Sequence, residues 1–115
     1  MQLGIDSHTF VSDNARTAEG YYFNYAAQMN RIGAERGWGP YSKAQYDGGR
    51  SREGALFIGD HSEVTDKILY MHELFGITRF IAHMDVGAPS HADMMKSIEL
   101  FGTKVAPAVR KSLLQ

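Results

Sequence analysis

The chain has 115 residues, of which 43% are hydrophobic and 22% charged, and its formal net charge is −1. That charge provides neither a basic surface for nucleic acid nor a polybasic patch for a membrane. The chain has no cysteine, which excludes disulfides and thiolate metal sites. These totals predict one cytoplasmic domain over residues 1–115.

The first predicted element is a strand over residues 1–11, in which apolar Leu3 and Ile5 alternate with polar residues. A helix follows, with Ser12 or Asp13 as its N-cap. It is expected to end at Gly33 or Gly37. Its apolar stripe comprises Ala18, Tyr22, Tyr25, Met29 and Ile32.

Residues 38–54 are rich in glycine and polar side chains and show no hydrophobic period. They are therefore predicted to form an irregular, mobile loop. Trp38 and Tyr41 flank a turn in this segment, where they either cover a pocket or anchor the loop.

A second helix is predicted from Asp60, which forms a capping-box pair with Glu63. Gly76 is expected to end it in the left-handed conformation, which a residue without Cβ adopts at little cost. The predicted buried stripe is Val64, Ile68, Met71 and Phe75.

A second strand, residues 79–86, carries two different rows of side chains. One parity holds Phe80, Ala82, Met84 and Val86, and the other holds Arg79, Ile81, His83 and Asp85. A fully buried parallel strand is usually apolar on both parities. The mostly polar row therefore indicates that one side of this strand faces something other than a core.

The last predicted helix begins at Ser90, with Asp93 as its capping partner, and Pro107 is expected to kink or shorten it. Its predicted buried residues are Met94, Ile98, Phe101 and Val105. The order of elements implies two parallel strands with helical crossovers. Two such strands leave unpaired edges, so we expect self-association, most simply as a homodimer.

Ligands of α/β folds bind beyond the carboxyl ends of the strands. The candidate catalytic and binding residues are therefore those at the ends of the two predicted strands. His8 and His83, together with Asp85, are the candidate acid–base residues or donors to a bound anion. The alternative stays open that these side chains only line a solvated or subunit-facing surface.

Two further kinds of site were considered. His83 and Asp85, with His91 nearby, have the ligand types of a two-histidine, one-carboxylate iron site, but we expect no metal here. Gly59 and Gly87 precede helix starts that could bind phosphate, but both starts already have good capping side chains, so plain capping is the expected role.

Several stretches together resemble the C-terminal end of bacterial luciferase-like flavin-dependent monooxygenases. Residues 57–64, FIGDHSEV, are similar to the Val-Gly-(Ser/Thr)-Pro-Glu-x-Val segment of that family, with Asp60-His61 in place of Ser/Thr-Pro. IELF at 98–101 and VAPAVR at 105–110 are similar to its last helix. Residues 7–11 and 35–47 also resemble the preceding part, so the likeness covers nearly the whole chain.

That resemblance implies a (β/α)₈ barrel binding FMN, or in some branches the deazaflavin F420. A full barrel takes about 250 residues, so this chain is expected to supply a partial barrel: the last two βα units, with a split crossover helix. The resemblance places Ser7, His8, Asp85 and Gly87 nearest the cofactor, with Ser7 and Gly87 as cofactor-binding candidates.

Two functions remain open at this point. The chain is either the C-terminal part of such an oxidoreductase or a non-catalytic remnant, an interaction module stabilised by homo-oligomerisation. In the first case its partner is the missing N-terminal barrel portion. The isolated chain is then expected to retain no flavin and to be inactive.

Overall fold

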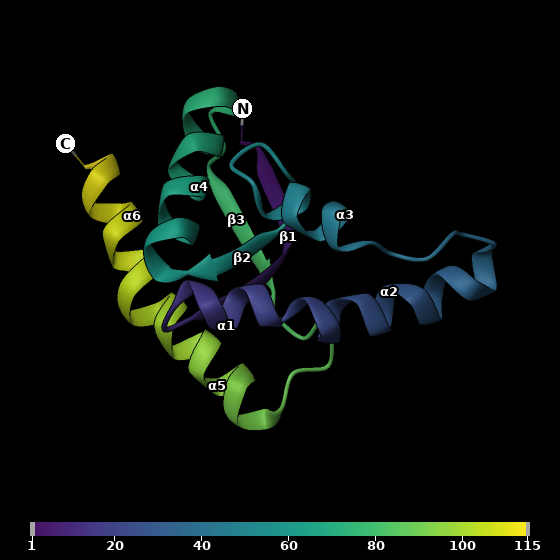
Figure 1. Ribbon diagram of the computed structural model, residues 1–115. Coiled ribbons are helices and arrows are strands. Elements are labelled where there is room, and N and C mark those ends of the chain that lie inside the picture. Colours follow the sequence, from purple (N-terminus) through teal and green to yellow (C-terminus); the bar gives the residue numbers. More distant parts are fainter. Residues whose placement is uncertain (1, 115) are drawn as a thin grey trace.

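Three parallel strands form a small open sheet in the computed structural model, which describes residues 2–114 (Figure 1). The strands are β1 (Gly4–Ser12), β2 (Phe57–Asp60) and β3 (Arg79–His83), in the order β2-β1-β3. The long central strand β1 pairs with β3 through Gly4–His8 and with β2 through Thr9–Ser12. The sequence predicted β1 and β3 but not β2, whose four residues lead directly into a helix.

The first helical segment is divided into α1 (Ala15–Gly20) and α2 (Tyr22–Arg36). Its N-cap is Asn14, whose side chain accepts a hydrogen bond from the Thr17 N–H, so the prediction of Ser12 or Asp13 was wrong. Ser12 still belongs to β1. Gly37 ends α2 in the left-handed conformation at φ 74°, which confirms one of the two predicted ends.

The predicted irregular loop contains a helix, α3 (Lys43–Arg50). A capping box between Ser42 and Gln45 begins it, and the prediction for residues 38–54 was wrong there. Tertiary packing explains the difference. The fully buried Tyr46 donates from its hydroxyl to the Ala18 carbonyl at 2.6 Å, which fastens α3 to α1 despite Gly48 and Gly49.

Helix α4 (His61–Phe75) has both predicted caps, namely the Asp60–Glu63 capping box and left-handed Gly76. Three predicted core positions, Val64, Ile68 and Met71, are buried. Phe75 is 59% exposed, so its prediction as a core residue was wrong. The chain turns at Gly76, and Ile77 beyond the turn enters the core in its place.

The C-terminal helical segment comprises α5 (His91–Leu100), a π-helical turn (Phe101–Val105) and α6 (Ala106–Leu113). The wide turn changes the helical phase, so that Leu100 and Val105 are buried whereas Ile98 is 45% exposed, contrary to the prediction. Pro107 lies in the first turn of α6, and the helical segment continues past it to Leu113.

Two hydrophobic cores lie on opposite faces of the sheet. One face of β1 and β2, with Val11 and Phe57, packs beneath α4 and the C-terminal helices. The other face, with Phe10 and Ile58, packs beneath α1, α2 and α3, but only over the carboxyl half of β1.

The remaining part of that second face is the open face, which consists of Gly4 and the side chains of Asp6, Arg79, Ile81 and His83. All five residues are exposed. The predicted alternation in β3 is thereby confirmed, because Phe80 and Ala82 on the other parity are half-buried.

No helix among residues 2–114 is both long enough and apolar enough to cross a membrane.

Candidate functional site

Two histidines lie side by side where the open face meets the core under α2. His8 in β1 and His83 in β3 are partners in the parallel register. Their rings are arranged edge to face, with centroids 5.4 Å apart and an interplanar angle of 85°. Residues 75 positions apart in the sequence are thus brought together by strand pairing, as expected from their shared parity.

Asp85 joins this pair through His83. The Oδ1 atom of Asp85 lies 2.8 Å from Nε2 of His83, within hydrogen-bonding distance, and forms an ion pair when His83 is protonated. The Asp85 side chain is 72% exposed and that of His83 51% exposed. The contact orients the His83 ring but adds little stability in water.

Tyr25 of α2 is the member of the site that the sequence did not identify. Its hydroxyl lies 2.8 Å from Nδ1 of His8, while its ring packs in the core beneath α2. Burial, with a smaller effect of Tyr41, raises the pKa of Tyr25 to about 12, so its hydroxyl keeps its proton at neutral pH.

His8 is held toward its neutral form. Its pKa is lowered, mainly by burial and next by the charge of His83, and Asp6 and Asp85 oppose this shift only in part. A neutral imidazole next to a protonated phenol can accept the phenol's hydrogen bond at Nδ1 and present Nε2–H to a ligand. The four-residue group His8, His83, Asp85 and Tyr25 is called the histidine site below.

Ser7 and Gly87, the two predicted cofactor-binding residues, have their polar groups engaged within the chain. The Ser7 hydroxyl donates to the Ala55 carbonyl at 2.8 Å, and the Gly87 N–H donates to Oε1 of Gln28. Gly87 adopts φ 81°, and a Cβ there would lie 2.7 Å from the Tyr21 hydroxyl oxygen. These two residues therefore shape the loops beside the histidine site, and a role in cofactor binding stays a prediction.

Within residues 2–114, no group of three or more His, Asp or Glu side chains is arranged to hold a metal ion. His91 is the first residue of α5.

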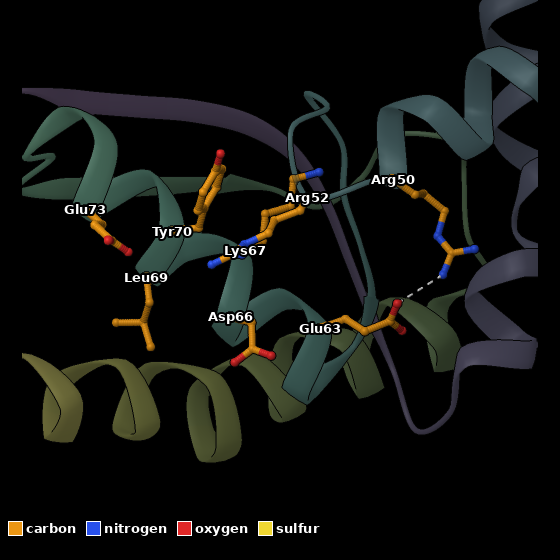
Figure 2. Close-up of a pocket in the computed structure, with 8 residues that line it drawn as sticks. All are labelled: Arg50, Arg52, Glu63, Asp66, Lys67, Leu69, Tyr70 and Glu73. Carbon is orange, nitrogen blue, oxygen red and sulfur yellow. Dashed lines mark ion pairs between the residues drawn. The ribbon is translucent and has the colours of Figure 1, made fainter.

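A hollow with a volume of about 580 Å³ lies along α4 and shares no residue with the histidine site (Figure 2). Its cations are already engaged. The Lys67 Nζ donates to the carbonyls of Gly49 at 3.0 Å, Ser51 at 2.7 Å and Leu56.

The two arginines at this hollow also have partners. The guanidinium of Arg52 stacks 4.1 Å from the centre of the Tyr70 ring, and Arg50 forms an ion pair with Glu63 at 3.7 Å. Asp66 and Glu73 add negative charge to the same walls. The charges nearly balance, and Lys67 serves to anchor the loop after α3, so this hollow has a structural explanation.

Comparison of the chain with protein-family models finds no match, and comparison with curated proteins finds none either.

Proposed function

We propose that the chain is the C-terminal part of a luciferase-like flavin-dependent monooxygenase, in which the histidine site contributes to a flavin site. The cofactor is FMN or F420. The observation that supports this most directly is the open face: a parallel sheet, helix-covered on one side, turns polar side chains outward on the other.

The arrangement of layers matches what two neighbouring barrel strands require. In a (β/α)₈ barrel, helices cover the outside of the strands, and functional residues lie toward their carboxyl ends. Here α4 and the C-terminal helices cover one face of β1 and β3. The opposite face carries Asp6, His8, Arg79 and His83, which in the proposed barrel line its interior and mouth.

The extra strand β2 is also compatible with this proposal. A barrel places sequential strands side by side, whereas the order here is β2-β1-β3. However, β2 pairs only with Thr9–Ser12, at the carboxyl half of β1. No strand among residues 2–114 pairs with the edge of Gly4–His8 away from β3, which leaves room for a preceding barrel strand.

The chemistry of the histidine site suits a cofactor with hydrogen-bonding ring atoms. His8 and Tyr25 supply a neutral donor and acceptor, and His83 with Asp85 can take up or release a proton. The flavin supplies the electron-transfer chemistry when bound. Because Ser7 and Gly87 are occupied internally, the chain alone offers few donors for a phosphate group.

The isolated chain is therefore expected to purify colourless and to bind FMN only weakly, with a Kd on the order of 1 mM, or −4 kcal/mol. Titration of labelled protein with FMN, followed by NMR, tests the site directly. The expected result is a set of shifts around His8, Tyr25 and His83, weakened in His8→Ala. The control is His61→Ala, an exposed histidine at the start of α4.

Intact protein that shows no shift at the histidine site with FMN or with F420 would overturn the proposal. A yellow preparation with stoichiometric flavin would instead show that the chain carries most of the cofactor contacts itself.

The alternative function, an interaction module stabilised by self-association, is favoured by one observation. Within residues 2–114 both outer strands have an unpaired edge, and two apolar residues are exposed, Leu3 before β1 at 42% and Ile81 in β3 at 49%. A folded, colourless oligomer with no FMN response would favour this function over the first.

A further inference from the structure

The outer edge of β3 is the feature of the chain that most clearly lacks a partner. Among residues 2–114, β3 pairs with β1 alone. The Arg79 N–H donates to the Leu3 carbonyl at 3.3 Å, so odd-numbered residues of β3 direct their backbone groups toward β1. The N–H and C=O groups of Phe80 and Ala82 consequently point outward.

The edge of β1 that pairs with β3 extends beyond the end of β3, and a side chain binds a backbone group there. Beyond the end of β3, the Val11 N–H donates to the Ser97 hydroxyl at 2.8 Å, and Ser97 is fully buried. The Ser97 hydroxyl thus satisfies the hydrogen bond of β1 beyond the end of β3. No described strand pairs with the outer edge of β3.

We infer that a second copy of this chain docks on the outer edge of β3, antiparallel, with a two-fold axis beside Ile81. Ile81 is the central residue of β3, so this register overlaps the whole strand. It also pairs the outward-pointing backbone groups. Phe80 faces Ala82 of the other copy, and the two residues of each such pair exchange N–H···O=C hydrogen bonds. This inference rests on the alternative function above and applies to the chain without the N-terminal barrel portion, whose first strand would pair with the same edge in the proposed barrel.

Charges on the open face fit this register. Arg79 of one copy faces His83 of the other and lies diagonal to its Asp85, and the two-fold axis repeats the contact. A hollow of about 330 Å³ beside Thr78, Arg79 and Ile81 lies at the end of β3 that Asp85 of the second copy approaches. A parallel, in-register addition would instead set Arg79 beside Arg79, so that like charges would face each other.

The apolar gain comes from Ile81, which is 49% exposed in a single copy. In the antiparallel dimer the two Ile81 side chains meet at a non-hydrogen-bonded pair, with Cα atoms about 4.5 Å apart. The contact covers part of each Ile81 side chain, and the two open faces join into one surface.

Light scattering of the whole chain gives the first test. We expect twice the 12.8 kDa chain mass. Ile81→Lys sets two like charges opposite each other and should give a folded monomer, as judged by circular dichroism. Met95→Lys is the matched control, because Met95 in α5 is 51% exposed and should leave the dimer intact.

The absence of cysteine from the chain permits a sharper test. In the Ile81→Cys dimer the Cα atoms of the two cysteines would lie within the roughly 4.4–6.8 Å range found in disulfides. Mild oxidation should therefore give a covalent dimer. Met95→Cys should cross-link far more slowly. Equal rates for the two variants, or a wild-type mass that stays at 12.8 kDa at high concentration, would overturn the inference.

A charge exchange tests the register separately. Arg79→Glu should weaken the dimer by about tenfold, since it opposes Asp85 in two symmetric places. Asp85→Arg added to Arg79→Glu should restore the affinity. A double variant no tighter than Arg79→Glu alone would show that these two residues do not meet across the axis.

Discussion

The hydroxyl of Tyr25 and Nδ1 of His8 lie 2.8 Å apart and join helix α2 to the middle of strand β1. One side of this contact is core, and the other is the open face. The bond therefore couples the packing of α2 to the position of a titratable ring.

Removing this hydroxyl should loosen the ring without disturbing the core. Tyr25→Phe keeps the packed ring and is expected to lower the free energy of unfolding by about 1 kcal/mol in urea denaturation. Tyr22→Phe serves as the control, because the Tyr22 hydroxyl makes a longer 3.3 Å bond to the Tyr41 carbonyl. A smaller effect at Tyr25 than at Tyr22 would contradict this reading of the contact.

The lowered pKa of His8 predicts the sign of a pH effect. The unfolded chain binds a proton at His8 near pH 6.5, whereas the folded chain resists it. Stability is therefore expected to fall as the pH decreases from about 7 to 5.5, a range in which most carboxyl groups stay ionised. Urea unfolding should show a steeper fall in wild type than in His8→Gln, and an equal slope would contradict the shift.

Two phenylalanines allow the same substitution to be compared at a buried and an exposed site. Phe57 is 2% exposed and packs against Phe80 and the Lys67 ammonium, whereas Phe75 is 59% exposed. Phe57→Ala should cost about 3–5 kcal/mol of unfolding free energy. Phe75→Ala should stay within about 0.5 kcal/mol. Similar losses at both positions would mean that α4 packs in a different phase.

Lys67 should behave as a structural anchor. It is 4% exposed, and its removal leaves the carbonyls of Gly49, Ser51 and Leu56 without their donor. Lys67→Met is expected to cost about 2–4 kcal/mol and to speed hydrogen exchange after α3. Lys111→Met, at an exposed position in α6, is the control and should change little.

The helix ends that depend only on neighbouring residues could be predicted from the sequence. The Asp60–Glu63 capping box and left-handed Gly76 were confirmed because each involves only a few adjacent residues. The two rows of side chains in β3 were confirmed for the same reason, since alternation is a property of the strand itself.

The pairing of His8 with His83 was expected, but several other features that depend on distant residues were not predicted. Helix α3 depends on Tyr46 reaching Ala18, and β2 depends on pairing with Thr9–Ser12. The π-helical turn changed the phase of the last segment and exposed Ile98. Tyr25 was correctly placed on the apolar stripe of α2, but its hydroxyl could be linked to His8 only once the helix was docked.

The sheet order also has a consequence for the newly made chain. The central strand β1 is synthesised first, yet its last edge position is closed by Ser97, 86 residues after Val11. At about 5–20 residues per second, a ribosome needs roughly 4–17 s to make that stretch. In the first part of that time, before β2 and β3 are made, Phe10 and Val11 have no neighbouring strand from this chain. The polar residues Asp6, Ser7, His8 and Thr9 precede them directly and oppose aggregation. Asp6, which makes the open face polar in the folded chain, is therefore also one of the residues that protect the strand before its partner strands are made.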